Sequence, residues 1–301
     1  MSSPFPHLQA TKKAISTAFD QAAPHYDEAA LLQQEVGNRF IEQLPLFKIE
    51  PKRILDLGCG TGQISRALTN YYPKASLISL DIAEGMVRMT REQTQSSSLK
   101  FWKQPKQHFL VGDAESLPFA DNSFELIASN LTFQWCSDLP KLFAEIQRVL
   151  APNGLLLFTT LGPDTLKELR SSWQEVDSSI HVNHFADMHD VGDAMLASQL
   201  GDPVVDMEQI TITYEKAITL MRDLKTIGAH NMNPDRSRGL TSPKKLGAVS
   251  AAYEQFRMAD GMLPATYEVI YGHAWRGDLQ KIAEPQQDFA FDISDIKPFT
   301  G

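Results

Sequence analysis

The chain has 301 residues, of which 43% are hydrophobic and 22% are charged, as in ordinary globular proteins and unlike disordered or fibrous chains. This length predicts one enlarged domain or a core that carries an insertion. The formal net charge of −9 argues against nucleic acid or an anionic membrane as a partner, because such partners select a basic face.

Cysteine usage and apolar runs indicate the compartment. Cys59 and Cys136 are too few for a disulfide framework and lack the spacing of zinc ligands. The first twenty residues contain no apolar segment of a signal peptide, and runs such as Leu155–Phe158 are too short to span a bilayer. We therefore expect a cytoplasmic protein without a membrane partner.

The first half of the chain alternates between helical and strand patterns. Apolar residues at helical spacing predict a helix over Lys12–Leu44, interrupted near Pro24. Short apolar runs then alternate with helices, which predicts a mostly parallel, doubly wound sheet covered on both faces. The expected strands are Arg53–Leu57, Ser76–Ile82, His108–Val111, Phe124–Ser129 and Leu155–Leu161, and the expected helices are Gln63–Tyr72, Ala83–Gln95 and Leu139–Leu150, the last ended by Pro152-Asn153-Gly154.

After Leu161 this alternation stops. The later segments predict a mainly helical insertion and two more strands, for a seven-stranded α/β sheet in all. The expected helices are Asp164–Gln174, Val191–Leu200, Lys216–Gly228 and Pro243–Met258, and the expected strands are Gln209–Tyr214 and Thr266–Trp275. The organisation that follows is a helical lid at 1–50, a core at 51–162, an insertion with the last strands at 163–282, and a poorly ordered tail at 283–301.

The strongest local signal is the run from Asp56 to Gly62, Asp-Leu-Gly-Cys-Gly-Thr-Gly, directly after the first expected strand. Glycines permit a tight turn and let a ligand approach the backbone, and the following helix N-terminus presents unpaired N–H groups. Gln63 stands where a dinucleotide fingerprint has its last glycine, which weakens an NAD interpretation. No nucleoside triphosphate loop motif is present in the sequence.

Two further aspartates follow expected strands. Asp81 ends the second strand about twenty residues after the glycines, where a carboxylate can bind ribose hydroxyls; the alternative is that it caps the next helix. Asp113 follows the third strand, in Gly-Asp-Ala-Glu-Ser-Leu-Pro-Phe; it can accept the exocyclic amine of adenine while the N–H of Ala114 meets a ring nitrogen. With Asp56 and the glycines, these aspartates form a set rather than isolated turn residues.

This set, between Arg53 and Thr160, resembles the class I S-adenosylmethionine-dependent methyltransferases, which have a Rossmann-like fold. The resemblance implies that Asp56 and the glycine loop surround the methionine part of the cofactor, that Asp81 binds the ribose, and that Asp113 and Ala114 hold the adenine. The implied cofactor-binding residues are Tyr26, Gln33, Asp56, Gly58, Cys59, Gly60, Gly62, Asp81, Ile82, Met86, Asp113, Ala114, Asn130 and Leu131.

Flanking segments resemble a narrower family, the malonyl-acyl carrier protein O-methyltransferases of biotin synthesis, over about Ala14 to Arg276. The most discriminating segments are Ser129-Asn130-Leu131-Thr132-Phe133-Gln134-Trp135-Cys136 and Leu224-Lys225-Thr226-Ile227-Gly228-Ala229. The resemblance implies methylation of the free carboxylate of a malonyl thioester. That carboxylate has a pKa of roughly 3–4 and is already a nucleophile at neutral pH, so we expect no catalytic base.

The expected substrate pocket contains polar and aromatic side chains that accept a small carboxylate. The candidates are Tyr26, Gln134, Trp135, His181 and Asn183. For Trp135 a core role, and for Tyr26 mere packing of the lid helix, remain open. A metal site built from His181, His184 and His189 is disfavoured because no matching cysteine or carboxylate set accompanies them. Cys59 is expected to be a small filler and Cys136 has no activating setting.

The implied partner is malonyl-acyl carrier protein, which is strongly acidic. Residues 216–245 contain seven basic and two acidic residues, a net charge of +5 in a chain of net −9. Such a segment is either a solvated surface or a docking surface for that partner. The docking candidates are Arg222, Lys225, Arg236, Arg238, Lys244 and Lys245.

Three alternatives remain open at this point: a general small-carboxylate methyltransferase, an arginine hydroxylase of respiratory complex assembly on the same fold, and a protein that binds the cofactor without turnover. We expect a monomer or a weak dimer that needs no metal.

Overall fold

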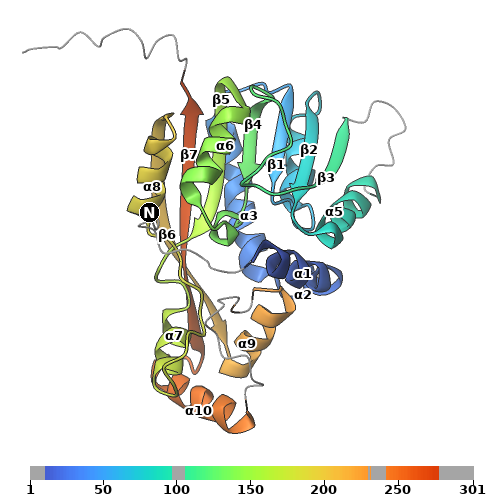
Figure 1. Cartoon of the computed structure of the whole chain (residues 1–301). Helices are drawn as coiled ribbons and strands as arrows, with labels where there is room; N and C mark the ends of the chain where they lie inside the picture. Colours follow the sequence, from blue (N-terminus) through green and yellow to red (C-terminus); the bar gives the residue numbers. More distant parts are fainter. Residues whose placement is uncertain (1–10, 97–105, 230, 232–241, 278–301) are drawn as a thin grey trace, which may run out of the picture.

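The computed structural model describes residues 11–96, 106–229, 231 and 242–277, and within them the chain folds around one seven-stranded sheet (Figure 1). The strand order is β3-β2-β1-β4-β5-β7-β6. The first five strands are parallel, and β7 is antiparallel to both β5 and β6. The strands are β1 Arg53–Leu57, β2 Ser76–Asp81, β3 Gln107–Val111, β4 Phe124–Ser129, β5 Leu150–Leu161, β6 Leu200–Tyr214 and β7 Leu263–Arg276. The predicted mostly parallel, seven-stranded α/β fold is confirmed.

Helices surround this sheet. They are α1 Lys12–Ala22, α2 Tyr26–Ala29, α3 Leu31–Gln43, α4 Gln63–Tyr71, α5 Glu84–Ser96, α6 Leu139–Val149, α7 Lys167–Gln174, α8 Met188–Ala197, α9 Ala217–Thr226 and α10 Pro243–Tyr253. The N-terminal helical segment is interrupted near Pro24, as predicted, and once more at Ala30, so that it forms three helices. A 3₁₀ turn, Ala23–His25, contains Pro24, whose ring and missing N–H disrupt helical bonding, and a second break falls at Ala30 with ψ of +42°.

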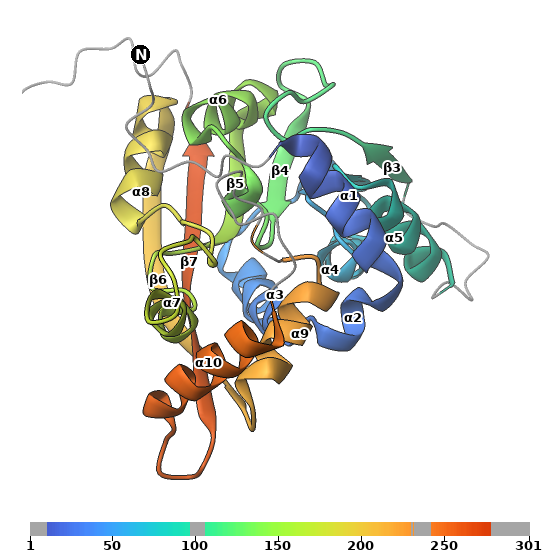
Figure 2. The same ribbon diagram turned by 60° about the horizontal axis from the view of Figure 1, so that its bottom comes forward.

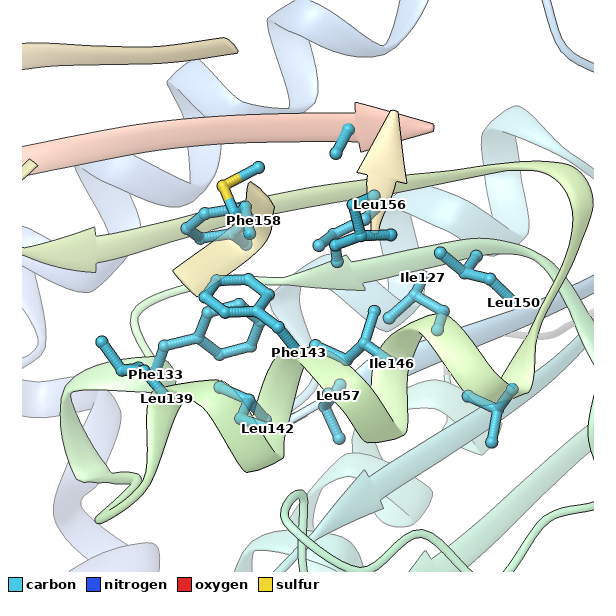
Figure 3. Packing of buried hydrophobic residues seen from close by; sticks show 14 of the residues in the cluster. Leu57, Ile127, Phe133, Leu139, Leu142, Phe143, Ile146, Leu150, Leu156 and Phe158 are labelled. Atoms are coloured by element: carbon cyan, nitrogen blue, oxygen red, sulfur yellow. The ribbon is translucent and has the colours of Figure 1, made fainter. Parts of the chain in front are cut away.

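The two faces of the sheet carry separate apolar clusters because successive strand residues point to opposite sides. On one face Leu57, Ile127 and Phe158 pack against α6 and α8 (Figure 3). On the other face Ile54 and Leu126 pack against α3 and α4. Burial on both faces explains why the core strands are continuously apolar, and it fixes the sheet register on which the loops at the strand ends depend.

Strands β6 and β7 run well beyond the rest of the sheet. β5 pairs with β7 as far as Leu161 opposite Val269, whereas β6 and β7 continue to Tyr214 opposite Leu263. The projecting ribbon packs with α7, α9 and α10, which lie together at one end of the molecule (Figures 1 and 2). This end of the molecule faces the carboxyl ends of the parallel strands.

The starts of β5 and β6 differ most from the prediction, whereas β7 begins three residues earlier than expected, at Leu263. β6 begins at Leu200, not Gln209, because an edge strand tolerates Pro203 at the register shift between Gly201 and Val204. The Pro152-Asn153-Gly154 turn lies inside β5 as an irregularity, with Asn153 at φ of 60°, so β5 starts at Leu150. The predicted tail at 283–301 lies outside the described residues. Among the helices of the described ranges, none combines the length and apolar character needed to cross a membrane.

Candidate functional site

A cavity of about 980 Å³ lies at the carboxyl ends of β1, β2, β3 and β4. In the sheet order β1 has β2 on one side and β4 on the other, so this is the switch point at which open α/β sheets bind ligands. The N-terminal helices α1 and α2 lie beside these strand ends (Figure 1). The sequence-predicted residues that line the cavity are Tyr26, Gln33, Gly58, Cys59, Gly60, Asp81, Ile82, Met86, Asp113, Ala114, Asn130, Leu131 and Trp135.

The three glycines of the loop after β1 have different roles. All have positive φ: 78° at Gly58, 53° at Gly60 and 92° at Gly62. A Cβ at Gly58 would lie 2.0 Å from Oγ1 of Thr132, and one at Gly62 would lie 2.9 Å from Cγ2 of Thr90. A Cβ at Gly60 would meet no atom within 4 Å. Gly58 and Gly62 are therefore required by packing, whereas Gly60 turns its bare backbone toward open cavity space.

Asp56 differs from its predicted place around a ligand. Its side chain is 1% exposed and does not line the cavity. Oδ2 accepts a hydrogen bond from Ser65 at the start of α4, and Ser65 also contacts Ser79 at 2.7 Å. Burial raises the pKa of Asp56 to about 7. Since β1 is covered on both faces, its third buried residue points into the interior, where Asp56 connects β1 to α4. Gly62, which caps α4, also lies off the cavity wall.

Asp81 bonds the backbone that precedes α5 and also lines the cavity. Oδ1 accepts the N–H of Ala83 at 2.9 Å, just before α5 begins, and Oδ2 accepts the N–H of Gly60 at 3.0 Å. The side chain is 9% exposed and lines the cavity. Burial raises its pKa to about 6. A carboxylate can accept about four hydrogen bonds, so Asp81 retains acceptor capacity for a ligand beside Gly60.

Lys12 and Glu115 also line the cavity and were missed from the sequence. Lys12 forms ion pairs with Asp113 and, at 2.7 Å, with Glu115. Glu115 is buried and accepts the backbone N–H groups of Ser137 and Asp138. Glu115 could have been found from its place in the motif Gly-Asp-Ala-Glu, next to Asp113 and Ala114. Nothing in the sequence around Lys12, at the start of α1, indicates that its side chain reaches the end of β3.

The N-terminal segment is bonded to the cavity rim along its length. Oγ of Ser16 donates to the carbonyl of Ile82 at 3.0 Å, and Oδ1 of Asp20 accepts the N–H of Gly85 at 2.7 Å. Farther along, Oδ1 of Asp27 accepts the hydroxyl of Thr61 at 2.6 Å. These bonds, with the Lys12 ion pairs, hold α1 and α2 over the cavity.

A second cavity of about 680 Å³ adjoins the first. Its inner wall comes from the ends of β4 and β5, and its outer wall comes from the β6–β7 ribbon and α9. Gln134 and Asn183, two of the substrate-positioning candidates, line it. Nε2 of Gln134 donates to the carbonyl of Leu131 at 2.6 Å, and Oε1 accepts the hydroxyl of Thr160 at 3.3 Å.

Five residues belong to the walls of both cavities: Phe19, Tyr26, Gln33, Leu131 and Trp135. Phe19 and Trp135 meet edge to face with ring centroids 5.1 Å apart, and burial raises the pKa of Tyr26 well above its usual value. Leu131 has φ of 49°, a strained conformation held because its N–H donates to Thr159. Oε1 of Gln33 is buried without a hydrogen-bond partner among the described residues. Trp135 is thus a wall between two cavities and not a core residue.

His181 lies on neither cavity wall, which corrects its assignment as a substrate-positioning candidate. Its ring stacks on Trp173 with centroids 3.6 Å apart, and Nε2 contacts Oδ1 of Asp177 at 2.7 Å. A planar imidazole covers an indole face well, so packing fixes it within the insertion. In the described ranges, no group of three or more His, Cys, Asp or Glu side chains is placed to hold a metal.

Four of the six predicted docking residues lie in the described part of the chain. Arg222 and Lys225 are exposed on α9, and Lys244 and Lys245 are exposed at the start of α10. Lys245 also forms an ion pair with Asp177 at 2.7 Å. Arg236 and Arg238 lie outside the described residues. The opposite face of α9 lines the second cavity.

Comparison with known proteins agrees with this geometry. A methyltransferase domain family matches residues 55–158. The chain is 49% identical, over 88% of its length and 89% of the relative's, to the malonyl-[acyl-carrier protein] O-methyltransferase of Methylovorus sp. (strain MP688). It is also 41% identical to the biotin biosynthesis bifunctional protein BioHC of Saccharophagus degradans. That match covers 87% of this chain and 46% of the longer relative.

Solved structures share the fold at low sequence identity. The crystal structure of YcgJ from Bacillus subtilis matches with a TM-score of 0.54 and 18% identity, over 81% of this chain and 99% of that one. Phosphoethanolamine N-methyltransferase 2 of Haemonchus contortus, in complex with S-adenosyl-L-methionine, matches with a TM-score of 0.51 and 18% identity. The match covers 80% of this chain and 53% of that one.

Proposed function

Because this chain belongs to the malonyl-[acyl-carrier protein] O-methyltransferase family, we propose that it methylates the free carboxylate of malonyl-acyl carrier protein, with S-adenosylmethionine as the donor. The product is the methyl ester that starts pimeloyl chain synthesis for biotin. The observation that carries the proposal is the pair of cavities that meet at five shared residues, one for a donor and one for an acceptor. The relatives do not favour the arginine-hydroxylase alternative.

The first cavity fits the cofactor. Gly60 leaves room for a ligand against the backbone, where a side chain would fill it. Asp81 beside it has acceptor capacity for ribose hydroxyls, and Asp113 with Ala114 would hold the adenine amine and a ring nitrogen. Asn130 and Leu131, after β4, would line the methionine end. When bound there, the cofactor supplies an electrophilic methyl group.

The chain needs no general base for this reaction, because a malonyl carboxylate is ionised at neutral pH. Its residues instead orient that carboxylate and exclude water. The amides of Gln134 and Asn183 are the groups of the second cavity suited to bind a carboxylate, and Phe19 and Trp135 form an apolar wall at the junction. Burial raises the pKa of the Cys59 thiol, which keeps it protonated and unreactive beside a methyl donor.

The acidic carrier protein would dock on the exposed basic residues of α9 and α10. Arg222 and Lys225 lie on the helix whose other face lines the acceptor cavity, so a carrier bound there would have its acyl arm near the cavity. Lys244, Arg236 and Arg238 belong to the same basic segment. We place the enzyme in the cytoplasm as a monomer or weak dimer, without nucleic acid or membrane partners.

Rescue of a bacterial strain that lacks early biotin synthesis tests the proposal. Growth without biotin is expected with the wild-type chain, and no growth is expected with Asp81→Ala. A wild-type chain that is expressed and binds the cofactor but fails to restore growth would overturn the proposal. Rescue by Asp81→Ala would remove Asp81 from the essential cofactor contacts.

A further inference from the structure

The acceptor cavity has an unexpected acidic wall. Asp223 of α9 lines it together with Leu224 and Ile227 from the same helix. Among the ion pairs formed by the described residues, none includes Asp223. A cavity that takes a carboxylate therefore contains a carboxyl group of the protein without a cationic partner.

Hydrogen bonds hold Asp223 in this position. Its carboxylate accepts the hydroxyl of Tyr214, which in turn is hydrogen-bonded to Tyr267. Tyr214 ends β6 and Tyr267 lies on β7, and both line the cavity. The side chain is thus anchored to the projecting ribbon, on the wall formed by the insertion.

The amide of Gln134 belongs to another wall of the cavity. Gln134 follows β4 and is bonded to the carbonyl of Leu131, one of the residues shared with the cofactor cavity. The acceptor cavity is therefore polarised, with the Gln134 amide near the donor and an acid on the insertion side. A methyl acceptor must place its reacting carboxylate near Gln134 and the donor cavity, and the rest of its structure toward Asp223.

We propose, on the basis of the proposed function, that Asp223 is a specificity-determining residue that rejects acceptors with a second negative charge, such as free malonate. A malonyl thioester has one carboxylate, and its other end is a neutral thioester that lies against Asp223, Leu224 and Ile227 without penalty. Free malonate is a dianion at neutral pH, and its second carboxylate faces both an apolar surface and a like charge. The enzyme thereby methylates the carrier-bound acid and leaves the free diacid unmodified.

Competition experiments test this inference. Malonate and monomethyl malonate are each measured as inhibitors of methyl transfer to malonyl-acyl carrier protein. They differ in one charge at the end that would face Asp223. The wild-type enzyme is expected to bind the monoester about tenfold more tightly, as for a like-charge contact in a partly buried site.

Variants separate the charge of Asp223 from its packing. Asp223→Asn keeps an acceptor for Tyr214 and removes the charge, so the preference should fall to nearly one. Tyr214→Phe keeps the charge and removes the hydrogen bond, so the preference should persist. Glu215→Gln makes the same charge change at an exposed residue next to the ribbon and should behave as wild type.

Several results would overturn the inference. They are equal inhibition by the two acids in the wild type, no competition by the monoester, an undiminished preference in Asp223→Asn, or the same loss in Glu215→Gln. Unchanged cofactor affinity in Asp223→Asn, measured by calorimetry, is expected if the variant affects acceptor choice alone. A wild-type enzyme that binds cofactor but does not methylate malonyl-acyl carrier protein would overturn the proposed function itself.

Discussion

Replacement of Asp81 by asparagine should weaken cofactor binding strongly without destabilising the unliganded protein. The carboxylate holds the N–H groups of Gly60 and Ala83 and lines the donor cavity. Two ribose hydroxyls bound to a carboxylate contribute about 3 kcal/mol, since hydrogen bonds to charged groups are each worth about 1.5–3 kcal/mol. The dissociation constant should therefore rise by about 100-fold.

The free energy of unfolding of the unliganded variant should change little, because the buried carboxylate of Asp81 is itself costly to keep ionised. Burial raises the pKa of Asp81 from 3.8 to about 6, so keeping it ionised in the folded state at pH 8 costs about 3 kcal/mol. Asparagine removes this cost, while the loss of one backbone hydrogen bond costs about 1 kcal/mol. The melting temperature at pH 8 should be unchanged or higher.

Calorimetry with S-adenosylhomocysteine and thermal melting without ligand measure the two quantities. Asp206→Asn is the matched control, because Asp206 is exposed on β6 and its carboxylate accepts the N–H of its neighbour Met207. A dissociation constant within threefold of wild type would refute the role of Asp81 in ribose binding. A matching loss of stability would show that Asp81 acts through the fold instead.

Three further predictions concern pH, the glycine loop and docking. Ribose binding uses ionised Asp81, whose pKa is about 6, so the affinity for S-adenosylhomocysteine should be constant above pH 7 and fall about tenfold per pH unit below pH 6. An affinity that calorimetry finds constant from pH 5 to 8 would contradict this. Gly58→Ala should lower the free energy of unfolding in urea by more than about 2 kcal/mol, because its Cβ would overlap the side chain of Thr132 and its φ is positive. Gly60→Ala should cost only about 1 kcal/mol of stability and mainly weaken cofactor binding, and equal stability losses in the two variants would count against these roles. Reversing the charges of Arg222 and Lys225 should raise KM for the malonyl carrier protein about tenfold with unchanged cofactor affinity, and an unchanged KM would exclude α9 as the docking face.

The core of the fold follows closely from the sequence. The mainly apolar runs Arg53–Leu57 and Phe124–Ser129 are strands with those bounds, since strands buried on both faces are predominantly apolar. Gly58, Gly60 and Asp81 line the first cavity because their spacing is fixed locally by one strand and one turn, whereas Asp56 and Gly62 of the same motif serve packing. Edge strand β6 was predicted too short, since an exposed edge lacks the apolar pattern that marks a buried strand.

The residues that the sequence missed depend on contacts between distant segments. Lys12 reaches Asp113 across about a hundred positions, and Asp223 enters the acceptor cavity only because the β6–β7 ribbon folds α9 back toward the sheet. His181 was misassigned for the converse reason, because its stacking on Trp173 is a tertiary contact that spacing does not reveal. Local motifs therefore locate the cavity at the carboxyl ends of the strands, whereas the walls of the second cavity require the assembled insertion.

Mass spectrometry of malonyl-acyl carrier protein after incubation with the enzyme and S-adenosylmethionine tests the central claim most directly. The account predicts a mass gain equal to one methyl substitution on the malonyl group, removed by mild ester hydrolysis and missing with acetyl-acyl carrier protein, which has no free carboxylate. An unchanged malonyl carrier, or equal methylation of the acetyl carrier, would contradict it.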